Sequence, residues 1–286
     1  MAKKKPAKPA TRKKAAKAVT KKAPVVQTNR LVFLTLDRIW LAAAVLFLGL
    51  AAAAPFVMEP ISYMFTQAHL ARDALLSQDG TAFIPAHRAV WDMELRWALS
   101  TVMALSAVLP ILYLTKLKDR YANRLISGRV VEWRWLDLAV TSALMVVIVA
   151  MLVGYTDIGT LKMMAGAMVL ACGLGWLAEQ QNNQKSRRPV WSAFGLGVIA
   201  GALPWLVIGI AKASTLLFGG VRSPWYVYAA CVIALGGFIL LALNQWNQHR
   251  RFRAWADYAF VERNYALISV ATKVAFAAVL IIGLAK

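Results

Sequence analysis

The chain has 286 residues, of which 60% are hydrophobic and only 16% are charged, and its mean hydropathy is +0.56. These values exclude a soluble globular domain and indicate an integral membrane protein. Its formal net charge of +20 therefore belongs to segments outside the apolar core.

Apolar runs of membrane-spanning length recur along the chain, and each predicts one transmembrane helix. Seven are present: about Ile39–Met58, Leu95–Leu114, Trp135–Tyr155, Leu161–Ala178, Val190–Ala211, Trp225–Leu243 and Tyr265–Leu284. If the N-terminal tail and the second, fourth and sixth loops share one side, that side holds 25 of the 33 lysines and arginines. By the positive-inside rule the N-terminus is then cytoplasmic and the C-terminus extracellular. The sequence thus predicts an all-α membrane protein folded as a seven-transmembrane-helix bundle.

Residues 1–31 are rich in Lys, Ala and Pro, and no apolar run follows the first lysines closely enough to form a signal peptide. We expect a retained, disordered basic tail in the cytoplasm, followed by a transmembrane domain over residues 32–286. The tail is suited to anionic membrane lipid or to an acidic cytoplasmic protein, although a tail that only reinforces topology has the same composition. It lacks the interleaved aromatic residues that stack on bases, which argues against a nucleic-acid partner.

The segment 59–91, between the first two predicted spans, is long for a connection within a bundle, so we expect it to have structure of its own. It contains His69 and His87, but two histidines 18 residues apart without further ligands predict surface residues rather than a metal site. Cys172 and Cys231 lie inside predicted spans, where a role in helix packing explains them better than a disulfide or a metal.

The last span carries one charge, Lys273, near its middle, and Ser269 lies one turn before it on the same face. A cation inside a lipid-embedded helix costs ~2.5–3.5 kcal/mol on insertion scales, so this lysine needs a partner or a covalent use, such as a Schiff base with an aldehyde. Asp137 in the third span is the natural partner, because either charge alone would be uncompensated. Measured from the outer helix ends, the two residues differ in depth by roughly 10 Å at ~1.5 Å per residue, unless the third span begins before Trp135 or the helices tilt.

Other polar and helix-breaking residues in the spans are weaker signals. Glu179 ends the fourth span, where we interpret it as an interfacial charge rather than a proton site. In the fifth span Pro204 removes one backbone hydrogen bond beside Trp205, which makes room for a buried ligand or bends the helix. Catalytic patterns such as HExxH, CxxC and GxSxG do not occur in the sequence, so we expect no enzymatic activity.

Four segments in combination resemble a known family. They are RWLDLAVTSALM, GVIAGALPWLVI, ALNQWNQ and WADYAFVERNYALISVATK, which belong to the third to seventh predicted spans. With a central lysine in the seventh span and a cytoplasmic N-terminus, they make the chain similar to the heliorhodopsins, the branch of microbial-type rhodopsins with inverted membrane topology. The resemblance implies the same rhodopsin-like bundle.

The resemblance also implies that Lys273 binds all-trans retinal as a protonated Schiff base and that Ser269 hydrogen-bonds near it. It places Asp137 at the counterion position of the family's arginine–tryptophan–x–acid motif, which begins here with Arg134 and Trp135. The positions around the polyene are matched by Thr141, Met145, Pro204, Trp205 and Phe238. The family usually has Glu where Asp137 stands and often has histidines inside the first two spans, which this sequence lacks, so no proton acceptor is assigned.

In function, the resemblance implies a light-sensing photoreceptor of the cell membrane, and a homodimer with the segment 59–91 near the contact. The charges of the tail and loops suggest the hypothesis that it signals to a soluble partner through its basic cytoplasmic face. A light-driven ion pump or light-gated proton channel on the same scaffold is the alternative, although only Asp137 and Glu179 are available as acids along the predicted path. A third interpretation is a transporter without a chromophore, in which Lys273 and Asp137 form a structural pair.

Overall fold

A computed structural model describes residues 25–72, 83–182, 188–220 and 222–286, with side chains described from residue 35 onward. Within this part of the chain, seven helices are long and apolar enough to cross a membrane, which confirms the predicted spans and a multi-pass membrane protein. They are α1 (Val25–Val57), α2 (Leu95–Leu114), α4 (Glu132–Leu152), α5 (Ile158–Gln181), α6 (Ser192–Phe218), α7 (Trp225–Arg250) and α8 (Tyr258–Gly283). Of the predicted tail, residues 25–31 are the start of α1, and residues 1–24 lie outside the described residues.

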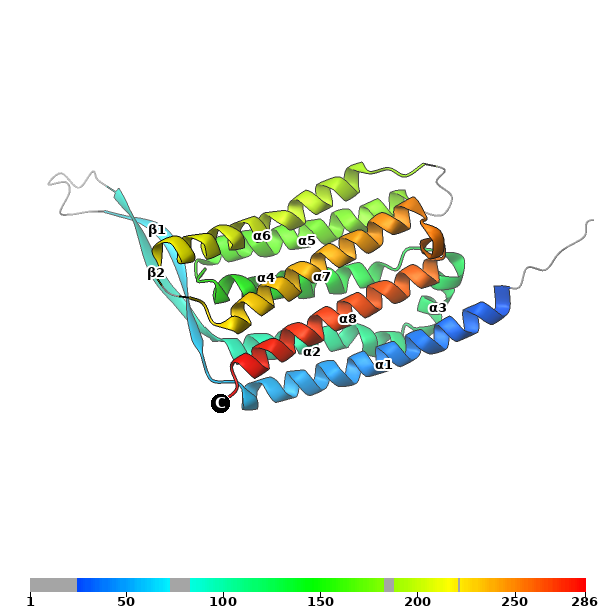
Figure 1. Cartoon of the computed structure of the whole chain (residues 1–286), viewed down its shortest axis with the longest axis horizontal. Coiled ribbons are helices and arrows are strands. Elements are labelled where there is room, and N and C mark those ends of the chain that lie inside the picture. Colours follow the sequence, from blue (N-terminus) through cyan, green and yellow to red (C-terminus); the bar gives the residue numbers. More distant parts are fainter. Residues whose placement is uncertain (1–24, 73–82, 183–187, 221) are drawn as a thin grey trace, which may run out of the picture.

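The helices lie side by side, and their connections gather at two ends of the bundle (Figure 1). We call one the hairpin end, because it carries the strands β1 (Ser62–Arg72) and β2 (Phe83–Glu94), and the other the α3 end, because it carries the short helix α3 (Lys118–Ser127). Consecutive helices pack as α1–α2, α4–α5, α5–α6 and α7–α8, and α8 closes the bundle against α1. Both α4 and α8 run from the α3 end towards the hairpin end, so they approach the middle of the bundle in the same direction.

Among the helices that begin earlier than predicted, α4 and α8 carry charged residues in the added turns. Helix α4 begins at Glu132, three residues before the predicted start of the third span. Helix α8 begins at Tyr258, seven residues before the predicted start of the seventh, and the side chain of Asp257 caps it by accepting a hydrogen bond from the Ala259 amide at 3.0 Å. The first turns of α8 contain Glu262 and Arg263. These charges interrupt the apolar pattern, but the helix continues through them.

The predicted structure in the segment 59–91 is an antiparallel hairpin, which adds a two-stranded sheet to an otherwise helical chain. The pairing register shifts between Phe65 and Thr66, where β2 has one extra residue, Val90. The Thr66 amide donates to the Thr156 carbonyl at 2.9 Å, which ties the hairpin to the start of α5. His69 and His87 are exposed on the two strands, and among the described residues no group of His, Cys, Asp and Glu could hold a metal ion.

Helix α3 is amphipathic and lies across the α3 end of the bundle. Its buried face consists of Tyr121 and Leu125, and its other residues are largely exposed. The Tyr121 ring stacks on Tyr113 of α2 with 4.1 Å between centroids, and its hydroxyl accepts a hydrogen bond from the indole of Trp40 at 3.3 Å. Burial, together with the nearby charge of Glu262, raises the pKa of Tyr121 well above the ordinary value of a tyrosine. The helix is thus anchored on the bundle by its aromatic side chain.

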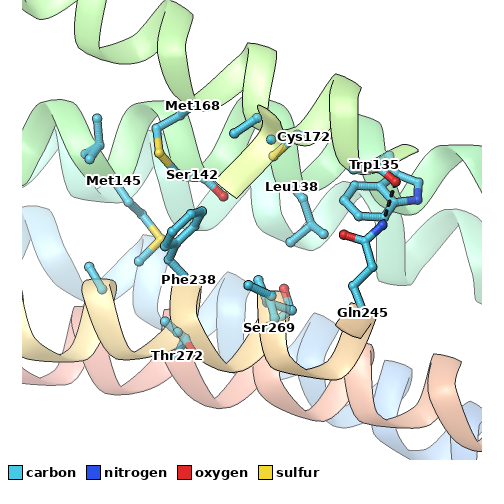
Figure 2. A pocket seen from close by; sticks show the side chains of 18 of the residues that line it. Trp135, Leu138, Ser142, Met145, Met168, Cys172, Phe238, Gln245, Ser269 and Thr272 are labelled. Atoms are coloured by element: carbon cyan, nitrogen blue, oxygen red, sulfur yellow. Dashed lines mark hydrogen bonds between the residues drawn. The ribbon is translucent and has the colours of Figure 1, made fainter. Parts of the chain in front are cut away.

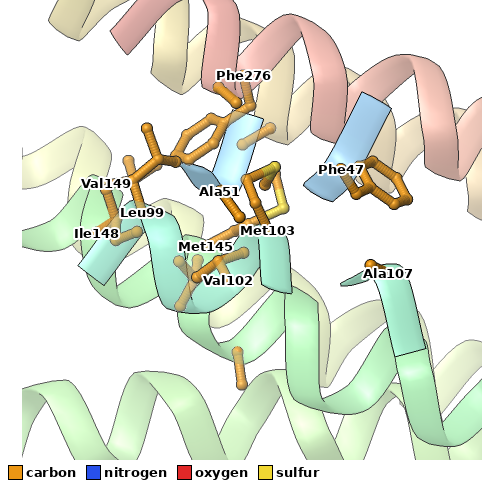
Figure 3. Close-up of a cluster of buried hydrophobic side chains, with 14 of the residues drawn as sticks. Phe47, Ala51, Leu99, Val102, Met103, Ala107, Met145, Ile148, Val149 and Phe276 are labelled. Carbon is orange, nitrogen blue, oxygen red and sulfur yellow. The ribbon is translucent and has the colours of Figure 1, made fainter. Parts of the chain in front are cut away.

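The main apolar core lies where α1, α2, α4 and α8 meet (Figure 3). Phe47, Leu99, Met103, Val149 and Phe276 are all at most 2% exposed there. Because α8 contributes to this core close to Lys273, packing in the core fixes the position of that lysine relative to α4.

Candidate functional site

The charged pair predicted from the sequence lies in the middle of the bundle. Nζ of Lys273 on α8 donates to Oδ2 of Asp137 on α4 at 2.7 Å, and the two side chains are 5% and 11% exposed. Asp137 is five residues from the start of α4 and Lys273 is 15 residues from the start of α8, yet their side chains meet, so the expected depth difference does not keep them apart. The pair thus neutralises two charges that would each be costly alone in the membrane.

Two nearby groups complete the surroundings of this pair. The Thr141 hydroxyl donates to the backbone carbonyl of Asp137 at 2.7 Å, so it stabilises the turn of α4 rather than contacting the carboxylate. The ring of Phe47 on α1 lies 5.7 Å from Nζ of Lys273, within the range of a cation–π contact. Among the described residues, Lys273 is therefore the single ion-pair partner of Asp137.

A large cavity begins at the lysine and extends between α4, α5, α6, α7 and α8. It encloses about 870 Å³ when the open solvent space at its mouth is included. Of the residues predicted from the sequence, Lys273, Ser269, Met145, Trp205 and Phe238 line it. Asp137, Thr141 and Pro204 do not line it: Asp137 is reached through Lys273, and Pro204 is buried beside Trp205 in α6.

Most of the other residues that line the cavity are apolar, and a few polar side chains lie among them. Met145 and Phe238 lie towards one end of the cavity, and Trp135 and Gln245 lie at the other (Figure 2). Gln245 donates to the Gly175 carbonyl at 2.6 Å, which fixes its amide at this end. The lining also includes Ser142, Met168, Cys172 and Thr272, which our sequence analysis did not assign to a site.

Two glycines allow aromatic rings to lie directly on the helix backbone of the cavity wall. A Cβ atom at Gly201 would be 2.4 Å from the ring of Phe238, and one at Gly175 would be 2.5 Å from the ring of Trp135. Since real Cβ atoms essentially never approach so closely, any side chain there would displace these rings. The shape of the cavity therefore depends on the absence of a side chain at these positions.

A second buried ionic cluster lies between the cavity and the α3 end. Arg134 of α4 forms ion pairs with Glu179 of α5, at 2.5 Å, and with Glu262 of α8. Glu179 also accepts hydrogen bonds from the indole of Trp135 at 2.5 Å and from the amide of Gln248 at 2.9 Å. The interpretation of Glu179 as an interfacial charge was wrong: its side chain is 2% exposed, because Arg134 supplies a buried countercharge.

Glu262 was missed because the seventh predicted span began at Tyr265. A usable signal was present, since Glu262, Ser269 and Lys273 are spaced by 7 and 4 residues and lie on one face of a helix. Tyr265, on the same helix, lines the cavity and lies over the guanidinium of Arg134 with 3.9 Å between ring centroid and Cζ. The two ionic clusters are thus separated by a wall that includes Tyr265.

Comparison with known proteins then decides the family. A sequence model of the heliorhodopsin family, described as "Heliorhodopsin", matches residues 30–284. The chain belongs to the heliorhodopsin family. None of the curated proteins compared with this heliorhodopsin matches it.

The fold is also found among solved structures. This heliorhodopsin is similar to the crystal structure of the transmembrane domain of the Salpingoeca rosetta rhodopsin phosphodiesterase, with a TM-score of 0.56 and 15% sequence identity. The similarity covers 90% of this chain and 88% of the other. At this identity it establishes a shared rhodopsin-like fold and nothing about activity.

Membership of the family implies a retinal chromophore, and the cavity fits one. Retinal is a long apolar aldehyde, and the cavity has an apolar and aromatic lining with one primary amine, that of Lys273, in its wall. That amine is already paired with a carboxylate, which suits a linkage that keeps a positive charge. The indole nitrogen of Trp205, in the cavity wall, is buried and has no hydrogen-bond partner among the described residues, which is unusual for a buried indole.

Proposed function

We propose that this heliorhodopsin is a light-sensing receptor in which Lys273 carries all-trans retinal as a protonated Schiff base and Asp137 is the counterion. Nζ of Lys273 would condense with the aldehyde carbon of retinal, with loss of one water. The observation that supports this most directly is the 2.7 Å contact between Lys273 and Asp137 beside an apolar cavity. Bound retinal supplies the absorption of light and the isomerisation that follows.

The chain's own residues have distinct roles in this proposal. Asp137 holds a negative charge next to Nζ and so keeps the linkage protonated in a medium of low dielectric. Thr141 orients the turn of α4 that carries Asp137. Ser269 provides a hydroxyl one turn before Lys273, and Met145, Trp205 and Phe238 would pack against the polyene.

We favour signalling over pumping because the polar groups of the bundle are distributed unevenly. Buried Arg134, Glu179, His249 and Glu262 all lie on the α3 side of Lys273. Between Lys273 and the hairpin end, no Asp, Glu, His, Lys or Arg among the described residues is buried. A pump needs relay groups on both sides of its Schiff base, and among the described residues buried groups of this kind lie on one side.

A light-driven pump or light-gated proton channel is the second candidate, supported by the same buried acids, which could form half of a proton path. A pump or channel would move ions across the membrane on illumination, whereas a signalling receptor would not. Cells that express the protein should show neither a sustained photocurrent nor a light-induced change of external pH. A retinal-dependent current of either kind would overturn the signalling proposal.

We further propose that the α3 end faces the cytoplasm, because most basic residues of the sequence lie on that side. Anionic lipid, or a cytoplasmic protein with an acidic surface, would bind there, and the homodimer would form near the hairpin. A cysteine at exposed Ile126 of α3 should react with an impermeant reagent only in opened cells, and one at exposed Leu70 of β1 in intact cells. The reverse pattern would contradict the orientation.

The first experiment is an absorption spectrum of the purified protein after addition of all-trans retinal. We expect a visible band that hydroxylamine bleaches and that Lys273→Ala abolishes. Lys212→Ala is the matched control, because Lys212 is also a lysine within a long apolar helix but hydrogen-bonds Ser223 and does not line the cavity. A visible band that survives in Lys273→Ala would refute the proposed attachment site.

A further inference from the structure

The cluster around Arg134 contains more negative than positive charge. Arg134 contacts both Glu179 and Glu262, and these three side chains are 5%, 2% and 1% exposed. With both carboxylates ionised, the cluster would carry one uncompensated negative charge in the interior of a membrane protein. An unpaired buried charge is costly enough that the group usually takes up a proton instead.

Among the described residues, Arg134 is the one buried arginine or lysine of this cluster. Arg251, at the end of α7, lines the same pocket as Glu179 but is exposed. Arg124 of α3 pairs with Glu132 at 3.0 Å and donates to the Val130 carbonyl, and Arg263 lies over the ring of Phe260. The other groups that face the cluster come from every element packed on it and are uncharged or aromatic: Tyr113 (α2), Tyr121 (α3), Trp135 (α4), Gln248 and His249 (α7), and Tyr258 and Tyr265 (α8). Of these, His249 could become cationic, so it is the competing holder of a proton.

The hydrogen bonds distinguish the two carboxylates. Both oxygens of Glu179 accept hydrogen bonds: Oε2 from Arg134 and from Trp135, and Oε1 from Gln248. Three donors stabilise an ionised carboxylate. In Glu262, Oε2 accepts from Arg134, but Oε1 is buried and has no hydrogen-bond partner among the described residues, with Tyr121 the polar side chain that interacts with this carboxyl group from α3. An oxygen in that position is satisfied when it carries a proton, because the hydroxyl can then donate.

We propose that the Arg134–Glu179–Glu262 cluster is a binding site for one exchangeable proton, held on Oε1 of Glu262. The hydroxyls of Tyr113 and Tyr121 are near enough to interact electrostatically with this carboxyl group, and that of Tyr113 is buried without a partner. They are the natural acceptors for the proton on Oε1.

The site has a route to solvent and a contact with the retinal cavity. A polar pocket at the α3 end is lined by Glu179, Gln248, Tyr258 and Arg251, so protons can reach the cluster from that side. On the other side, Trp135 and Tyr265 line the cavity and lie against Arg134. The proton site is therefore separated from the cavity by Trp135 and Tyr265 and is distinct from the Lys273–Asp137 pair.

The test is the infrared carbonyl band of a protonated carboxylic acid, measured on the purified full-length protein in the dark. The wild type should show this band, and it should shift when H₂O is replaced by D₂O. Glu262→Gln should abolish it. Glu179→Gln should abolish it too, because Glu262 would then ionise as the single countercharge of Arg134. Glu132→Gln, an exposed acid at the start of α4, should leave it unchanged.

Aspartate variants locate the proton without removing a carboxyl group, and they keep the test valid if a glutamine variant fails to fold. Glu262→Asp should move the band, and Glu179→Asp should leave its frequency unchanged. Three results would overturn the proposal: no such band in the wild type, a band that persists in folded Glu262→Gln, or a band that moves in Glu179→Asp alone. A proton on His249 would give the first of these results.

Discussion

Replacement of Asp137 by Asn would test whether the Lys273–Asp137 pair holds α4 and α8 together in the retinal-free protein. The change is nearly isosteric and removes the negative charge alone. Asp137 has no other ion-pair partner among the described residues, so the substitution leaves the ammonium of Lys273 buried and unpaired. The expected result is a large loss of stability.

The magnitude follows from the burial of the pair. Breaking a buried ion pair by removing one partner costs about 3–5 kcal/mol. The ring of Phe47, 5.7 Å from Nζ of Lys273, contacts the lysine in the wild type as well, so it does not reduce this cost. We therefore expect Asp137→Asn to lower the free energy of unfolding by about 3–5 kcal/mol. The double variant Asp137→Asn/Lys273→Gln, which buries no charge, should recover most of that loss.

The assay is a double-mutant cycle measured by denaturant unfolding in detergent micelles. The exposed pair of Lys118 and Asp37, at 3.4 Å and with side chains 57% and 38% exposed, is the control for the same chemistry at the surface. Its coupling energy should be about 0–1 kcal/mol. A coupling energy between Lys273 and Asp137 no larger than that of the control would refute the argument.

Two further substitutions test the cavity wall and the contact between hairpin and bundle. Gly201→Ala should push the Phe238 ring into the cavity and slow or prevent formation of the visible band with retinal; Gly209→Ala, on the same helix with nothing within 4 Å, should have no such effect. If both variants regenerate like the wild type, the cavity does not depend on that contact. The pKa of Asp157 is below its ordinary value, chiefly because the Thr160 amide donates a hydrogen bond to its carboxylate at 2.7 Å. The ionised carboxylate therefore stabilises the fold above the ordinary carboxyl pKa, and this stabilisation is lost as the pH falls through the lowered pKa of Asp157. Asp157→Ala should therefore lower the melting temperature at pH 7, and the difference from the wild type should close in acid; a difference that does not depend on pH would contradict this.

The features that the sequence predicted correctly share one physical basis, the cost of polar groups in lipid. Seven apolar runs had to become helices, because only helices satisfy the backbone within one segment. The pairing of Lys273 with Asp137 followed from the same cost, since neither charge could be buried alone. These inferences needed no knowledge of how the helices are rotated or which of them are neighbours.

The features that were missed depend on contacts between distant segments. The burial of Glu179 was not predictable from its own span, because its partner Arg134 lies 45 positions earlier in a helix whose neighbours are set by packing. Glu262 was left out of the predicted seventh span because it is charged, so that the apolar run began only at Tyr265, seven residues after the start of α8. The hairpin was expected only as unspecified structure, because pairing between β1 and β2 depends on residues of both strands.

Both ionic clusters are built from the same two helices, which bears on how light absorption could be communicated. Arg134 and Asp137 are three residues apart on α4, about one turn, and their partners Glu262 and Lys273 are both on α8. A change of charge at Lys273 would alter its attraction to Asp137 and so the position of one turn of α4 relative to α8. Because the same turn carries Arg134, the contact with Glu262 must respond, and Glu262 is next to Tyr121, which anchors α3. Packed side chains of α4, α8 and α3 thus connect the exposed face of α3 to the chromophore cavity.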